Sequence, residues 1–108
     1  MKKPDAKLIL TTTGSKEEAE RIAHTLVQER WAACVNILGP MRSVYRWEGN
    51  VDSAEEFLLL IKTTASAAAQ VQARVRELHS FELPEIVEVN VEGGSATYLK
   101  WIADSVKL

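Results

Sequence analysis

The sequence predicts an α+β fold of the ferredoxin-like kind, with elements in the order β-α-β-β-α-β followed by a C-terminal helix. Two observations predict it. Strand-like and helix-like apolar periodicities alternate along the chain in this order, and glycine, proline or asparagine separates them. Such an order gives an antiparallel sheet with helices on one face. Residues 1–108 are expected to form one domain without a linker or internal repeat.

The first strand is expected over residues 7–13, which are rich in leucine, isoleucine and threonine, and Gly14 ends it. A helix follows from Ser15, because Glu18 lies three residues later and the two side chains can cap each other's backbone amides. Apolar residues at helical spacing predict one buried stripe, formed by Ala19, Ile22, Ala23, Leu26 and Val27.

A long hairpin is expected next. Its first strand covers residues 32–38, is bent or broken at Gly39-Pro40, and continues over residues 42–48. Side chains alternate along a strand, so one face of the continuation is expected to carry Ser43, Tyr45 and Trp47.

Gly49-Asn50 is the expected hairpin turn, because glycine and asparagine tolerate positive φ. The return strand is expected over about residues 55–63. It is apolar on both faces, so both faces should be covered, with Leu58 and Leu60 on the side away from the helices.

The second helix is expected to be capped by Ser66 and to end near His79. Its predicted stripe is Ala68, Val71, Val75 and Leu78. After Pro84, a strand over residues 86–92 should bury its valines and expose Glu88, Asn90 and Glu92. A short amphipathic helix is expected from Ser95.

Composition excludes several classes of protein. The formal net charge is -2, and nothing in the composition indicates the basic face that nucleic-acid binding needs. Its longest apolar run, residues 57–61, is far too short to span a bilayer, and the N-terminus does not resemble a secretory signal. Cys34 is the single cysteine, so no internal disulfide is possible. A cytoplasmic protein without nucleic-acid or membrane partners is expected.

The hairpin predicts self-association. It is about a third of the chain, longer than a small sheet needs, and it carries Tyr45, Trp47 and Phe57, which a small core cannot all cover. Helices can shield only one side of the sheet, and exposed apolar surface of this kind usually marks an interface. The alternative is a hairpin tip that folds back on the chain's own helices.

Five stretches resemble one known family, the CutA divalent-ion tolerance proteins, and the resemblance runs from Leu8 to Trp101. The stretches are AACVNI (32–37), SVYRWEG (43–49), LIKT (60–63), HSFELPEI (79–86) and YLKW (98–101).

The resemblance implies a compact homotrimer, similar in architecture to the PII signalling proteins, and a link to tolerance of divalent cations, copper above all. It implies no enzymatic activity and no required cofactor, although a protein partner or small ligand is compatible with it. The long hairpin would pack between subunits, with Tyr45 and Trp47 at the trimer interface. A cleft between subunits would gather Lys62, Thr63, His79, Glu85 and Tyr98.

His79 is the best single candidate for a ligand of Cu²⁺ or another divalent cation, because imidazole suits copper and zinc. The alternative is a histidine at a helix C-terminus that bonds a backbone carbonyl. A copper site proposed in the family uses a cysteine late in the first strand. This chain has Thr11 there, and Leu78 rather than a second histidine precedes His79.

Other polar residues have two interpretations each. Cys34 is a soft-metal ligand or a small buried hydrophobe, and His24 is a surface metal contact or simply solvated. Glu85 is an ion-pair partner of Lys62 or a ligand for a hard cation, within an acidic set that also includes Glu82, Glu88 and Glu92.

Three functions are compatible with these residues. The first is a trimer that acts in cation tolerance by binding ions or partners. The second is a PII-like sensor that binds an anion or metabolite between subunits. The third is an enzyme of the acylphosphatase kind that uses Lys16 or Arg21, although residues 11–16 do not match that enzyme's loop.

Overall fold

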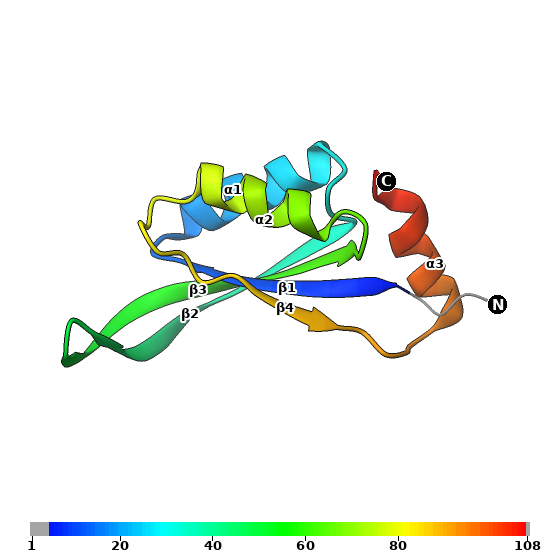
Figure 1. The fold of residues 1–108 in the computed structure, drawn as a ribbon. Helices are drawn as coiled ribbons and strands as arrows, with labels where there is room; N and C mark the ends of the chain where they lie inside the picture. The colour runs from blue at the N-terminus through cyan, green and yellow to red at the C-terminus, as the bar shows by residue number, and fades with distance from the viewer. Residues whose placement is uncertain (1–4, 108) are drawn as a thin grey trace.

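The computed structural model describes residues 5–107, so residues 1–4 and 108 of the expected domain lie outside the described part. Seven elements follow the expected order: β1 (Ala6–Thr13), α1 (Lys16–Gln28), β2 (Cys34–Trp47), β3 (Asn50–Thr64), α2 (Ala68–Leu78), β4 (Val87–Asn90) and α3 (Ala96–Ser105). The helices α1 and α2 lie on one face of the sheet, and α3 stands at one end (Figure 1). The α+β, ferredoxin-like prediction is confirmed.

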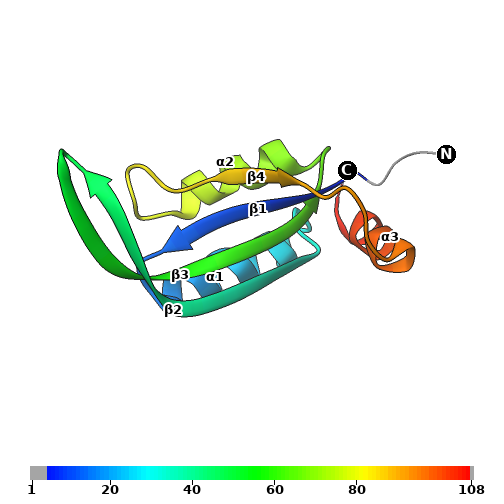
Figure 2. The same ribbon diagram turned by 90° about the horizontal axis from the view of Figure 1, so that it is seen from below.

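The sheet is antiparallel throughout and its strand order is β2-β3-β1-β4. Figure 2, seen from the side without helices, shows β1 and β3 in the middle and β2 and β4 at the edges. The main core lies between the sheet and the two helices. Its fully buried side chains include Ile9, Leu59 and Ile61 from the strands, with Ile22, Leu26, Val71 and Val75 from the helices.

The start of α1 agrees with the prediction only in part. Ser15 Oγ accepts from the Glu18 amide at 3.1 Å, so the hydroxyl cap is confirmed. The carboxylate of Glu18 does not return to Ser15, however. It is buried and accepts hydrogen bonds from the backbone amide and the hydroxyl of Ser80 at 2.6 and 3.0 Å.

The hairpin is longer than predicted, and its turn is one residue earlier. Trp47 pairs with Asn50, so the turn residues are Glu48 and Gly49, with φ of 49° and 84°. Two positive φ values are typical of a type I′ turn, whose twist matches that of the strands. At Gly39-Pro40 the strand is not broken: β2 continues through an irregularity between Leu38 and Met41.

Two further predictions were wrong. The N-cap of α2 is Ala67 and not Ser66, and Thr64 Oγ1 accepts the Ala67 amide at 3.3 Å. The strand β4 is shorter than expected, and its valines are exposed rather than buried: Val87 by 47% and Val89 by 40%. They pair with Leu10 and Leu8 on the side of the sheet that none of the described helices covers.

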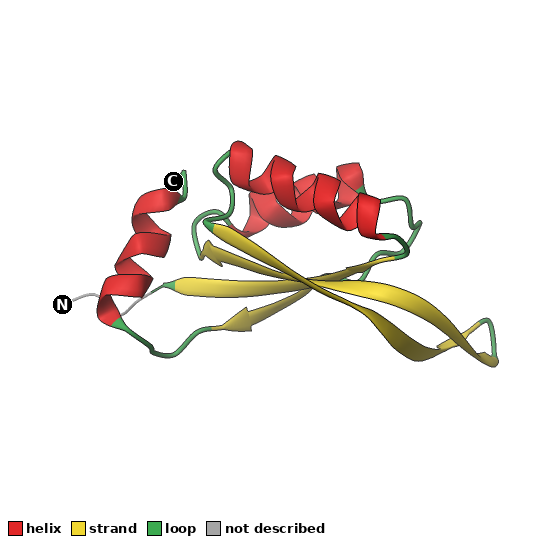
Figure 3. Cartoon of the chain, turned by 180° about the vertical axis from the view of Figure 1, so that it is seen from behind, coloured by secondary structure: helices red, strands yellow, loops and turns green. Residues whose placement is uncertain are grey.

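The helix α3 lies at the end of the sheet opposite the long hairpin, as the view from behind in Figure 3 shows. Ile102 and Val106 pack with Ala6 and Ala67 in a second, smaller core. Arg30 donates from its guanidinium to the carbonyls of Ser105 and Asp104 near the C-terminus of α3, where a positive charge is favoured by the helix dipole.

A polar group in the core predicts a stabilising substitution. Thr11 Oγ1 is fully buried and finds no hydrogen-bond partner among residues 5–107. Valine has the same branched shape without the hydroxyl, so Thr11→Val is expected to raise the free energy of unfolding by about 1 kcal/mol. Urea unfolding of both proteins at one protein concentration measures this, and an unchanged or lower midpoint would mean that the hydroxyl is satisfied in solution.

An ion pair links the two helices on the sheet's covered face. The Arg74 guanidinium donates to both carboxylate oxygens of Glu29 at 2.9 Å and lowers the pKa of that carboxyl. A lowered folded-state pKa means that the pair stabilises the fold above the ordinary glutamate pKa and loses this effect as pH falls through the lowered value. Glu29→Gln is therefore expected to make the stability of the protein depend less on pH at acid pH. The melting temperature, measured from neutral pH down through the pKa of the Glu29 carboxyl, tests this. An unchanged acid limb would contradict it.

Candidate functional site

The side of the sheet without helices, here called the open face, is apolar. The register places Leu58 and Leu60 on it, opposite Thr12 and Leu10, as predicted. The same pairing adds five further apolar residues to it: Leu8, Leu10, Leu38, Val87 and Val89. Three of these are at least 40% exposed in the single chain: Leu38, Val87 and Val89. Exposed apolar surface of this extent is typical of an interface.

The hairpin extends well beyond the rest of the sheet. The last pair between β1 and β3 is Thr13 with Phe57, so residues 41–56 form a free two-stranded ribbon, here called the arm. It gives the chain a length of 49 Å against widths of 25 and 22 Å. Tyr45 and Trp47 lie on the arm and are 40% and 48% exposed, so the arm does not fold back on this chain's own helices.

His79 sits at the C-cap of α2, at the junction with β1 and α1. Its Nε2 lies 2.6 Å from the carbonyl oxygen of Thr12, and its Nδ1 accepts from the Phe81 amide at 3.0 Å. A carbonyl can only accept and an amide can only donate, so the ring is neutral with its proton on Nε2. Glu18 Oε2 is 3.7 Å from Nδ1, outside hydrogen-bond range.

These contacts favour the structural interpretation of His79. Its side chain is fully buried, and both ring nitrogens are occupied by backbone groups, so neither has a lone pair free for a cation. Within residues 5–107 no three side chains of His, Cys, Asp or Glu are grouped as a metal site. The residues of the single chain do not fit a bound copper ion at His79.

The predicted cleft residues are only partly brought together. Lys62 Nζ lies 3.3 Å from the hydroxyl oxygen of Tyr98 and 5.6 Å from the centroid of its ring. Thr63 points to the other side of β3, is fully buried, and donates to the Trp31 carbonyl at 2.6 Å. Trp101 instead joins the pair, with its ring 5.5 Å from that of Tyr98.

Glu85 is remote from Lys62 within one chain. Lys62 pairs with Leu8, which pairs with Val89, four residues beyond Glu85 along the chain. At about 3.3 Å per residue that places Glu85 roughly 13 Å further along the sheet. An ion pair between them would need a second copy of the chain.

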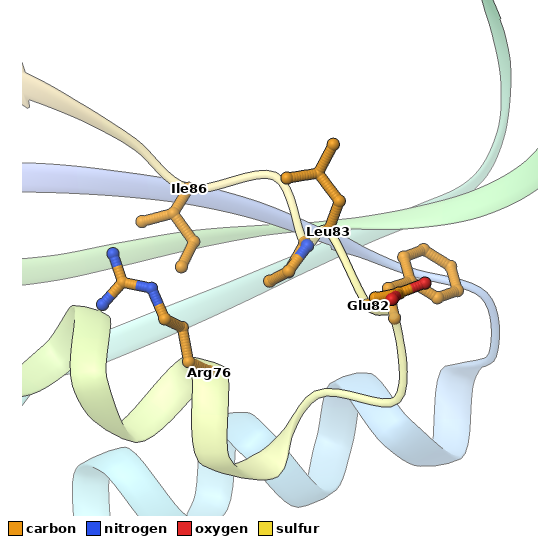
Figure 4. Close-up of a pocket in the computed structure, with 6 residues that line it drawn as sticks. Arg76, Glu82, Leu83 and Ile86 are labelled. Carbon is orange, nitrogen blue, oxygen red and sulfur yellow. The ribbon is translucent and has the colours of Figure 1, made fainter. Parts of the chain in front are cut away.

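Glu85 belongs to a segment between α2 and β4, residues 80–86, here called the proline loop. Its side chains include Phe81, 40% exposed, and Leu83, 72% exposed. A shallow hollow of about 320 Å³ lies here, lined by Arg76, Phe81, Glu82, Leu83, Pro84 and Ile86. In Figure 4 the side chain of Leu83 points away from the helices.

The remaining candidates have ordinary surroundings. Cys34 is partly buried on the open face opposite Lys62, and His24 is exposed on α1. Glu88 is exposed, as predicted, and it lies on the helix side of the sheet because it pairs with Ile9. It accepts from Gln72 at 3.0 Å and lies 3.5 Å from the Lys7 ammonium.

Sequence reasoning missed two residues that shape these sites. Glu18 fixes the start of the proline loop, but in the sequence it has the ordinary spacing of a helix cap. Trp101 completes the aromatic surface beside Lys62; a signal for it was its position three residues after Tyr98, which places both rings on one side of a helix.

Comparisons with known proteins agree with this fold. The CutA1 divalent ion tolerance protein model matches residues 7–105. The divalent-cation tolerance protein CutA of Thermus thermophilus is 44% identical over 98 residues, which cover 91% of this chain and 95% of that protein. The chloroplastic CutA of Arabidopsis thaliana is 38% identical, over 93% of this chain and 55% of its own length.

The fold match is equally close. The crystal structure of CutA from Xylella fastidiosa superposes with a TM-score of 0.93 at 41% identity, covering 95% of this chain and 99% of that one. No helix between residues 5 and 107 has the length and hydropathy needed to cross a membrane. The match over almost the whole sequence and the shared α+β architecture lead to one conclusion: this chain belongs to the CutA1 divalent ion tolerance family.

Proposed function

We propose that the protein acts in tolerance of divalent cations, copper above all, as a cytoplasmic homotrimer that binds an ion or a partner and performs no catalysis. Family membership supports the cation-tolerance role. The observation that supports self-association is the apolar open face, which includes Leu58, Leu60, Val87 and Val89 and which no element between residues 5 and 107 covers; the number of three copies is what the family resemblance implies. Two further copies would remove this surface from water, and the hydrophobic effect would then stabilise the assembly.

In this proposal His79 does not bind the cation. The ring of His79 is committed to the backbone groups of Thr12 and Phe81. Exposed carboxylates such as Glu82 and Glu85 lie on the proline loop, but no three metal-ligating side chains are grouped between residues 5 and 107, so a complete set of ligands would need more than one copy. Ion binding, if the purified protein shows it, is therefore expected to depend on assembly.

Growth in raised copper tests the proposal. Cells that lack their own CutA protein should be copper-sensitive, and this chain should restore growth, whereas a variant that cannot assemble should not. Equal growth with and without the chain would contradict the role in copper tolerance. Calorimetric titration of the purified protein with Cu²⁺ and Zn²⁺ then separates ion binding from action through a partner.

One observation favours a second function, a sensor that binds an anion between subunits. Lys62 Nζ and the Tyr98 hydroxyl are 3.3 Å apart, next to the exposed ring of Trp101. An ammonium and a hydroxyl that point to one place can both donate to a carboxylate or a phosphate.

Lys62→Met tests this second function. It keeps the length of the side chain and removes the charge, so it is expected to weaken binding of inorganic phosphate or a small dicarboxylate at least tenfold, measured by calorimetry. Lys100→Met is the matched control. Lys100 lies on α3, the helix that carries Tyr98, but among the described residues its ammonium bonds only Asp104. Equal isotherms for both variants would remove the anion site.

A further inference from the structure

We infer that Lys62, Tyr98 and Trp101 together bind an anion that carries an aromatic ring, with the anionic group at the Lys62 ammonium and the ring against the indole of Trp101. These three residues are here called the α3 site. The inference rests on the anion site proposed above as the second function, and it adds the chemical class of the ligand.

Two large rings are exposed on α3. The helix packs into the smaller core through Ile102 and Val106, whereas Tyr98 and Trp101 are 41% and 46% exposed. Their ring centroids are 5.5 Å apart and their planes differ by 31°. Two neighbouring rings at this angle form a continuous aromatic surface, on which a further planar ring can stack. The helix stands at the end of the sheet opposite the arm (Figure 3).

Lys62 places a positive charge on the apolar open face. Its partners on the two neighbouring strands are Leu8 and Cys34. Among residues 5–107 no carboxylate forms an ion pair with its ammonium, whose hydrogen-bond partner is the Tyr98 hydroxyl. Assembly through the open face would withdraw this charge from water, and an unpaired charge there is costly. The ammonium therefore needs an anion beside it.

Hydrogen atoms for such an anion are available. The Lys62 ammonium has three of them and uses one on the Tyr98 oxygen, which lies 3.3 Å from Nζ. The Tyr98 hydroxyl accepts that bond and keeps its own hydrogen, for which the described residues supply no acceptor. Both groups can therefore donate to one carboxylate or phosphate, and the bond from the ammonium is charge-assisted.

The charge also selects the kind of ligand that the rings can take. Exposed aromatic rings attract cations as well as planar apolar groups. Here Lys62 Nζ already lies 5.6 Å from the centroid of the Tyr98 ring, so it would repel a second cation. The Tyr98 ring lies beside both the ammonium and the Trp101 ring. An anion with a planar ring attached can use all three residues, whereas an inorganic anion uses only Lys62 and Tyr98.

Calorimetric titration with methyl phosphate and phenyl phosphate tests the inference in the full-length chain. The two probes carry the same charged group and differ in the ring. Stacking on an aromatic side chain should make phenyl phosphate bind about tenfold more tightly than methyl phosphate. Benzoate and adenosine monophosphate then distinguish two sources of such a ligand, because the tighter of the two identifies an aromatic acid or a nucleotide.

Substitutions separate the roles of the residues. Trp101→Leu should remove the difference between the two phosphates, and Trp101→Phe, which keeps a ring, should retain most of it. Tyr98→Phe should weaken binding of both phosphates alike, because it removes the hydroxyl and keeps the ring. Lys100→Met, on the same helix, should change neither affinity. Light scattering should report the same mass for every variant, so that a lost site is not confused with a lost assembly.

The outcomes distinguish this inference from the anion site on which it rests. Equal affinities for the two phosphates, both dependent on Lys62, would overturn the aromatic class of ligand and leave the anion site in place. A preference for phenyl phosphate that survives Trp101→Leu would also overturn it, because the ring would then bind elsewhere. Binding of neither phosphate would remove the anion site itself, and the inference with it.

Discussion

Leu60→Asp is expected to abolish assembly while each chain keeps its fold. Leu60 is on the open face and only partly buried in the single chain, so a carboxylate there can remain in water as long as the chain is alone. In a trimer the same carboxylate would be enclosed without a cation, at a cost on the order of several kcal/mol for each copy. Light scattering should report single copies, and far-ultraviolet circular dichroism should report unchanged secondary structure.

Val27→Asp is the control for this substitution. Val27 is also an exposed aliphatic residue, at 41%, but it lies on α1, on the far side of the sheet from Leu60. It should leave the assembly unchanged. If both variants stay trimeric, the open face is not where copies meet.

His79→Ala is expected to cost about 3 kcal/mol of folding free energy and to leave titrations with Cu²⁺ unchanged. The substitution removes a fully buried ring that contacts Phe81, with 4.8 Å between the ring centroids. It also leaves the Thr12 carbonyl and the Phe81 amide without their partner. Truncation of a buried aromatic ring and loss of two hydrogen bonds together give this magnitude.

The matched control is His24→Ala, which removes an exposed imidazole from α1. It should change the midpoint of urea unfolding little. Loss of Cu²⁺ binding in His79→Ala but not in His24→Ala, at unchanged stability, would restore His79 as a metal ligand and contradict the structural role described here.

Much of the fold could be predicted because apolar periodicity depends on local geometry. The alternating faces of β3 follow from a spacing of 2.0 residues and are confirmed. The stripe of α1 follows from a spacing of 3.6 residues and is confirmed except at its last member: Val27, predicted to be buried, is 41% exposed near the end of the helix. The position of the hairpin turn was wrong because Gly49 fits either of two neighbouring turns. The observed turn accepts Glu48 at positive φ, which composition alone would not favour.

The candidate site was less predictable because its contacts join distant parts of the chain. Glu18 has the spacing of a cap, yet its carboxylate bonds Ser80, 62 residues away. His79 has the chemistry of a ligand, yet the fold places the Thr12 carbonyl against its Nε2. The valines of β4 alternate as a half-buried strand does, but no element between residues 5 and 107 covers them.

Sedimentation equilibrium of the unmodified chain at low micromolar concentration tests the central claim most directly. The apolar open face and the exposed arm predict association, and the proposed trimer predicts a mass three times that of the 108-residue chain, independent of dilution over this range. A monodisperse, folded particle with the mass of one chain would contradict the claim, because the open face would then be stable in water.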